Sequence, residues 1–142
     1  MTTDSTRTAS VQLWLRIVFG VVPVVAGLDK FFNLLTDWTQ YINPTLERLL
    51  PVSASTFMHV VGIVEIAAGF IVLSPLTALG AYIVATWLAL IAVSLIASGR
   101  HTDVAVRDLV MSVSAYSLGA LSQVRERTPE REHVTARIST IA

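Results

Sequence analysis

The strongest constraint on the fold is an apolar segment, residues 57–73, that carries a single carboxylate, Glu65, near its middle. A membrane-spanning helix needs about 20 residues to cross a hydrocarbon core of about 30 Å, with about 17 as the lower limit. We therefore expect Glu65 near the membrane midplane, where a charged group is costly and usually has a partner or a function. On a helical wheel, Met58, Gly62 and Gly69 fall on the same side as Glu65. This places the carboxylate on a small-residue face that packs against other helices rather than against lipid.

Composition extends the membrane interpretation to the whole chain. Hydrophobic residues make up 54% of the 142 residues and charged residues only 14%, whereas soluble proteins carry about 25% charged residues. Nine of the charged residues lie before residue 9 or after residue 124, so the central segments lack the charged outer faces of a soluble helical domain. The formal net charge is zero and no basic cluster occurs among aromatic residues, which argues against nucleic acid as a partner. The chain has no cysteine, which excludes disulfides and thiolate metal sites.

The fold class predicted from these patterns is all-α, a bundle of four transmembrane helices with a lipid bilayer as its surroundings. The predicted spans are residues 11–32, 57–73, 76–97 and 104–124. They form one transmembrane domain, residues 10–124, which follows a polar N-terminal segment, residues 1–9. The polar C-terminal tail, residues 125–142, mixes both signs of charge and is expected to be solvated.

The connection between the first two spans, residues 33–56, contains the signals of a short helix. Asn43 followed by Pro44 is typical of an N-cap with proline at the first helical position. We expect this helix to lie on the membrane surface; a folded lid over the mouth of the bundle is the alternative. Trp38 and Tyr41 have amphipathic rings that suit the headgroup region.

Small residues mark the faces on which the spans are expected to pack. Gly20 and Gly27 stand seven residues apart on one face of the first span. In the fourth span a polar-to-small stripe runs down the helix and comprises Asp108, Ser112, Ala115, Gly119 and Ser122. Serines in this span are expected to bond to backbone carbonyls inside the bundle.

The distribution of basic residues predicts the orientation in the membrane. Six arginines lie on the side of the two termini and four basic residues on the other side, which favours cytoplasmic termini in the cell (inner) membrane. Polar and aromatic residues then gather near the outer face: Asp29, Lys30, Asp103, Trp38, Tyr41 and His59.

Glu65, Arg107 and Asp108 form the predicted polar site inside the membrane. Arg107 begins roughly 5–8 Å nearer the outer surface than Glu65, by a rise of about 1.5 Å per residue, and its side chain can reach the carboxylate. One interpretation is a structural pair that fixes helix packing. The other is a functional carboxylate that responds to protons or cations, or that contacts a quinone or another small apolar ligand.

The outer-face residues also allow two interpretations. Asp103 and Arg107 are four residues apart on a helix and can pair, while Lys30 and Asp108 can join the first and fourth spans. The first interpretation is a salt-bridge network that holds the bundle closed. The second is an anion or headgroup site at the mouth, with Trp38 and Tyr41 as its walls.

No cofactor or metal site is evident from the sequence, although a quinone is possible. His59 is the only histidine inside a predicted span, and a b-type haem needs two axial ligands. No serine–histidine–acid set and no glycine-rich phosphate loop occurs. No residue is therefore assigned a catalytic role.

Several segments together resemble the DoxX/DoxD-like family of small membrane proteins with four helices. They are GLDKFF at the end of the first span, Trp38 and Tyr41, GIVEIAAGFIVL around Glu65, and RDLVMSVSAYSLGAL in the fourth span. The resemblance covers residues 11–124. It implies a membrane protein tied to redox chemistry, because some members are subunits of a thiosulfate:quinone oxidoreductase and others belong to a complex that answers oxidative stress.

Three functions follow as hypotheses. The favoured one is an accessory or docking subunit of a membrane-associated oxidoreductase or redox-stress system, not catalytic on its own, with a redox enzyme or a second copy as partner. The second is a small proton-coupled transporter that uses Glu65. The third is a quinone-reactive subunit in which the quinone head is held by Glu65, His59, Tyr41 and Trp38.

Overall fold

The computed structural model describes the backbone of residues 3–141 and the side chains of residues 6–124. Its elements are α1 (Thr3–Phe32), the 3-10 helix η1 (Trp38–Tyr41), α2 (Pro44–Leu49), α3 (Ala54–Leu73), α4 (Thr77–Ser98) and α5 (Thr102–Ile141). Four of them, α1, α3, α4 and α5, contain stretches long and apolar enough to cross a membrane. The predicted all-α fold with four transmembrane helices is thus confirmed.

Several helices extend beyond the predicted spans. α1 begins at Thr3, so its helix includes most of the polar N-terminal segment. α3 begins at Ala54, about one turn before the predicted start. α5 continues as a helix to Ile141, beyond its apolar part. The expectation that the C-terminal tail is solvated concerns the side chains of residues 125–142, which lie outside the described residues.

Local capping explains where the shorter elements begin and end. The Asn43 side chain accepts a hydrogen bond from the Thr45 N–H at 2.9 Å, and Pro44 occupies the first turn of α2, as the sequence predicted. The Ser53 hydroxyl accepts from the backbone at the start of α3. α4 ends at Gly99, which adopts φ 66°, a left-handed conformation that glycine tolerates best.

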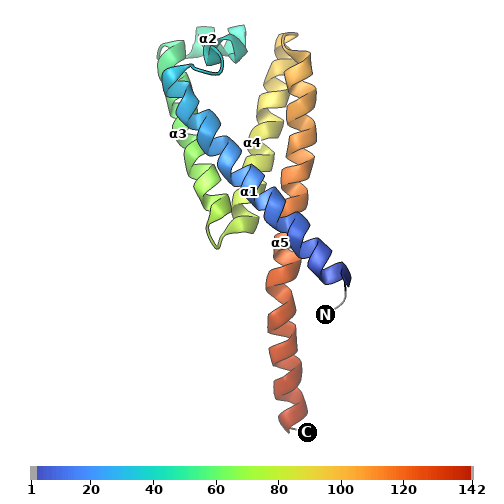
Figure 1. The fold of residues 1–142 in the computed structure, drawn as a ribbon. Coiled ribbons are helices and arrows are strands. Elements are labelled where there is room, and N and C mark those ends of the chain that lie inside the picture. The colour runs from blue at the N-terminus through green and yellow to red at the C-terminus, as the bar shows by residue number, and fades with distance from the viewer. Residues whose placement is uncertain (1–2, 142) are drawn as a thin grey trace.

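The helices associate as two antiparallel pairs (Figure 1). α1 packs along α3, and α4 packs along α5. Residues 74–76 join α3 to α4, and from this turn the two pairs diverge toward the end of the bundle that holds α2 (Figure 1). We call this the α2 end.

Glycines allow α1 and α3 to touch through their backbones. A Cβ atom added to Gly62 would lie 2.6 Å from the Gly27 carbonyl oxygen, and one added to Gly69 would lie 2.5 Å from that of Gly20. These distances are too short for any real side chain, so only glycine permits the contact. The glycine face predicted for the first span thus packs directly on the small-residue face of α3.

The α5 stripe faces the bundle interior. Ala115 is fully buried, and Asp108 and Ser122 are 5% and 2% exposed. The Ser112 hydroxyl donates to the Ala85 carbonyl of α4 at 2.7 Å, as predicted, whereas Ser114 and Ser117 donate to carbonyls of α5 on its exposed side. The Gln12 amide of α1 donates to the Ser122 hydroxyl at 3.0 Å and ties α1 to α5 at the end opposite α2.

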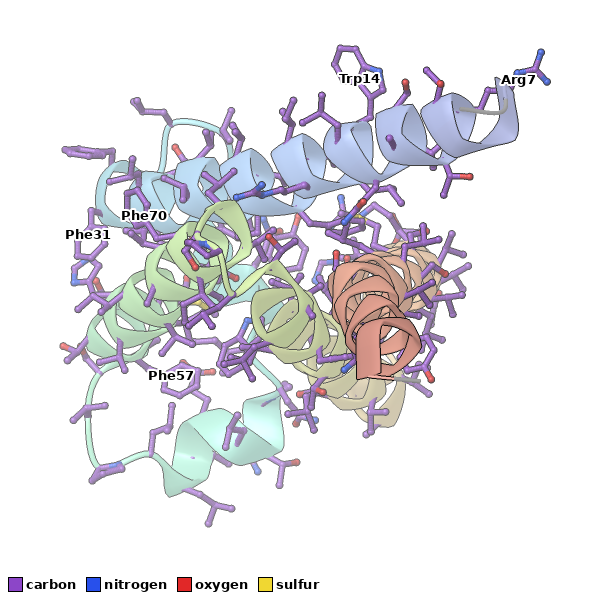
Figure 2. The ribbon with its side chains drawn as sticks, turned by 90° about the horizontal axis from the view of Figure 1, so that it is seen from below. Arg7, Trp14, Phe31, Phe57 and Phe70 are labelled. Carbon is purple, nitrogen blue, oxygen red and sulfur yellow. The ribbon has the colours of Figure 1, made fainter. Side chains whose placement is uncertain are left out.

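The outward surface of the spans is apolar, as a lipid environment requires. Trp14 of α1 is 67% exposed and points away from the other helices (Figure 2). Phe70 of α3 is 59% exposed. Arg16 is an exception on α1, because its guanidinium donates to the carbonyls of Val72, Leu73 and Ser74. It therefore satisfies acceptors that the end of α3 leaves unpaired.

We expect replacement of Gly62 by leucine to destabilise the protein. The new side chain would meet the Gly27 carbonyl and force α1 and α3 apart, and overpacking of this kind costs about 1–3 kcal/mol or more. The measurement is the unfolding midpoint in mixed detergent–SDS micelles, followed by circular dichroism.

The matched control is Ala67→Leu, since Ala67 lies on the exposed face of the same helix. Equal unfolding midpoints for the two variants would contradict the backbone contact between α1 and α3.

Candidate functional site

A buried ion pair joins the two helices of the first pair. The Lys30 Nζ atom of α1 lies 2.5 Å from Oε2 of Glu65 in α3. Only 4% and 11% of the two side-chain surfaces are exposed. Glu65 therefore faces the bundle interior, on the same face of α3 as buried Met58, Gly62 and Gly69.

The partner of Glu65 is Lys30 and not Arg107, which corrects the sequence prediction. α1 and α3 are antiparallel and touch at Gly27 and Gly62, and each charged residue follows its glycine by three positions. Helical side chains incline toward the N-terminus of their own helix. In an antiparallel pair these inclinations bring Lys30 and Glu65 toward each other across the glycine contact.

Trp38 lies against both neighbouring charges at the end of α1. Its indole N–H donates to Oδ2 of Asp29 at 2.7 Å, and the Lys30 Nζ atom lies 3.7 Å from the centroid of its ring. Asp29 also accepts the backbone N–H groups of Leu34 and Leu35. The structure thus brings Asp29, Lys30 and Trp38 together and fixes the start of the loop that follows α1.

A second charged pair lies on α5. Arg107 donates to Oδ1 of Asp108, at 3.2 Å from its Nη2 atom, where Asp108 is buried and the Arg107 side chain is 64% exposed. The predicted pairing of Asp103 with Arg107 is wrong, because the guanidinium turns toward its chain neighbour. Lys30 forms its ion pair with Glu65; Asp108 interacts electrostatically with the same lysine but forms no ion pair with it. Among the described side chains Asp103 forms no ion pair.

The remaining predicted residues lie apart from the ion pair. His59 stacks on Phe31, with ring centroids 4.8 Å apart and an interplanar angle of 4°. Phe31 lies at the outer edge of α1, so this stack is peripheral (Figure 2). Tyr41 contacts the ring of His101 at 4.8 Å. Within the described residues no group of three His, Cys, Asp or Glu side chains is placed to hold a metal ion.

The divergence of the two helix pairs leaves a cavity of about 720 Å³ toward the α2 end. Its walls are mainly apolar side chains of α1, α3, α4 and α5. The polar residues that line it include Lys30, Trp38, Glu65, Trp87, Arg107 and Asp108. A volume of this size falls within the range of about 300–1,000 Å³ typical of small-molecule sites.

Trp87 of α4 is a lining residue that the sequence did not single out. Its indole nitrogen is buried and faces the Glu65 carboxylate, but it makes no hydrogen bond of standard geometry. A buried donor that is incompletely satisfied is costly, so an acceptor that reached this N–H beside Glu65 would be bound favourably. Its position in an apolar run of α4 carried no signal, because only the packing of α4 on the cavity reveals where the N–H points.

The electrostatics of the cavity favour a ligand without net charge. Two cations and two carboxylates line it, and they are paired as Lys30 with Glu65 and Arg107 with Asp108. A charged ligand would disturb this balance in a low-dielectric environment, where uncompensated charge is expensive. A neutral polar head with an apolar body is the chemistry that fits.

The fold and this site together define a small multi-pass membrane protein with a largely apolar cavity between its helices that carries a few polar groups. The chain belongs to the DoxX family, whose model matches residues 11–98, from α1 to the end of α4. Lys30, Glu65 and Trp87 lie within the matched range, whereas Arg107 and Asp108 lie beyond it. Comparison with curated proteins and with solved structures found no significant match.

We predict that Lys30→Met destabilises the protein more than the double change Lys30→Met/Glu65→Met. Removal of one partner leaves a buried carboxylate unpaired, which costs about 3–5 kcal/mol, whereas apolar replacement of both partners is often nearly neutral. Unfolding free energies in mixed micelles, measured for the two single variants and the double variant, test this. Strictly additive losses would show that the two side chains do not interact.

Proposed function

We propose that this DoxX-family protein is an accessory subunit of a membrane oxidoreductase system and that its cavity binds a quinone. The observation that carries the proposal is the Lys30–Glu65 ion pair at the wall of a largely apolar cavity. A lipid-soluble quinone has a neutral ring with two carbonyl acceptors and an apolar tail. This chemistry matches the balanced charges and the apolar walls of the cavity.

Two donors are available for the quinone carbonyls. Trp87 offers a buried indole N–H that faces the Glu65 carboxylate and makes no hydrogen bond of standard geometry. Lys30 carries three N–H donors, and the hydrogen bond to Glu65 uses one of them. Hydrogen bonds from these groups would orient the ring, while apolar side chains of α1, α4 and α5 that line the cavity would contact the tail.

The accessory role assigns electron transfer to a partner enzyme and quinone binding to this chain. The family resemblance supports this division, because it implies subunits of quinone-linked oxidoreductases. Family membership alone does not fix an activity, so the proposal depends on the cavity and on a partner that supplies electrons.

Quinone binding is expected to be saturable and to weaken in Trp87→Phe. Loss of one neutral hydrogen bond costs about 0.5–1.5 kcal/mol, or roughly a two- to tenfold rise in Kd. Isothermal titration of a short-tailed quinone into protein in lipid nanodiscs measures this change.

The control is Trp14→Phe, because Trp14 points outward from α1. Absence of saturable binding to the unaltered protein would reject the quinone site. Equal weakening of quinone binding in Trp87→Phe and Trp14→Phe would show that Trp87 is not part of the quinone site.

The accessory role predicts that an oxidoreductase co-purifies with the protein from native membranes in mild detergent. The measurement is affinity isolation followed by protein identification and a quinone-reduction assay, from stressed and unstressed cells. Recovery of the bare protein under both conditions would contradict an accessory role, even if the cavity binds quinone.

A further inference from the structure

We infer that the ligand reaches the cavity sideways from the bilayer, through an opening between α1 and α5, and that its apolar tail stays in this opening. The inference rests on the proposed function in one respect, namely that the cavity holds a ligand with a polar head and an apolar tail. Three features of the structure carry it: a loop across the α2 end, a gap between α3 and α4 that is filled around Ile42, and a mainly apolar rim between α1 and α5.

The loop after α1 closes the α2 end. Its Tyr41 packs against a cluster at the ends of α4 and α5 that contains Leu95 and Ala105. The Asn43 side chain donates to the Ser94 carbonyl of α4 at 3.1 Å. At its other end, Trp38 is held by Asp29. The loop is therefore anchored on α1 and α4 at once and lies across the aqueous side of the cavity.

The same loop fills the gap between α3 and α4. Ile42 is 6% exposed and forms a cluster with Met58 and Val61 of α3. Trp87 of α4 and Phe57 of α3 pack against this cluster. Side chains from the loop and from both helices thus fill this gap around Ile42, while Leu46 of α2 and Leu90 of α4 line the cavity and remain exposed.

The side between α1 and α5 is different. The two helices are tied together at the end opposite α2, where Gln12 bonds to Ser122. α1 then crosses α5 obliquely, and the two helices separate toward the α2 end (Figure 1). No loop residue among those described is packed between them there in the way that Ile42 is packed between α3 and α4.

The rim of this opening reaches the lipid-facing surface and is apolar on its α1 side, whereas on its α5 side the exposed Arg107 lies between two apolar residues. Val22 and Val25 of α1 line the cavity and are 45% and 50% exposed. Val104 and Met111 of α5 line it from the other side. We call these four residues the lateral opening. A hydrocarbon tail suits such a rim, whereas the charged pair Lys30–Glu65 lies deeper and suits the head.

The absence of cysteine from the chain makes a direct test possible. Ser94→Cys places one thiol on the cavity wall with little change in size. In liposomes this thiol is treated with a maleimide on a long alkyl chain, which dissolves in the bilayer, or with a charged, water-soluble maleimide. We expect the alkyl maleimide to label this thiol faster than the charged maleimide does, when the rate of each reagent is divided by its rate with the denatured protein.

Narrowing of the lateral opening provides the decisive comparison. In the Ser94→Cys background, Val22→Trp is expected to slow the alkyl maleimide severalfold. Val18→Trp is the matched control, because Val18 is 43% exposed on the same helix and does not line the cavity. Met111→Trp narrows the opening from α5 and gives the same expectation, should the α1 variant fail to fold.

Faster labelling by the charged maleimide would overturn the lateral route, and so would equal rates in the Val22→Trp and Val18→Trp proteins. Neither reagent is a quinone, so these rates are independent of whether a quinone binds. A failed quinone titration with intact lateral labelling would reject the proposed ligand alone. Saturable quinone binding without preferential labelling by the alkyl maleimide would reject the lateral route alone.

Discussion

The Lys30–Glu65 ion pair is the interaction on which the rest of the structure depends. Burial of a charge in a low-dielectric interior costs several kcal/mol, and a pair offsets this cost only when its geometry is close and well supported. The support here comes from Gly27 and Gly62, whose backbone contact lets α1 and α3 approach closely enough for the two side chains to meet. The close packing of α1 on α3 and the ion pair between these two helices therefore depend on each other.

The ion pair also accounts for the shape of the bundle. It joins α1 to α3 within one helix pair, so the two pairs are free to separate toward the α2 end (Figure 1). The loop after α1 then uses the same lysine, because Trp38 packs its ring over Lys30 and bonds to Asp29. A cavity with a covered aqueous end, polar groups in its wall and apolar surroundings is the consequence. That combination suits recognition of an amphipathic molecule inside the membrane.

Sequence patterns predicted the helices and their inward faces, but not the contacts between helices. Hydropathy and a helical wheel predict that Glu65 points inward, because the inward face of a helix can be recognised from the residues that surround Glu65 in the sequence. They cannot say which helix it meets, since that depends on the register and tilt of α1 against α3. This is why Arg107 was predicted as the partner in place of Lys30. For the same reason the roles of Trp87 in the cavity wall and of Arg16 at the end of α3 carried no sequence signal.

The most direct measurement of the central claim is the distance between the Lys30 amine and the Glu65 carboxyl carbon in lipid. Lys30 is the only lysine in the chain, so ¹⁵Nζ-lysine labelling marks this one amine. Rotational-echo double-resonance NMR with ¹³Cδ-glutamate in liposomes then reports whether a carboxyl carbon lies beside it. The structure predicts strong dephasing that disappears in Glu65→Gln, whose residue is not labelled. Absence of dephasing in the unaltered protein, or its persistence in that variant, would contradict the ion pair.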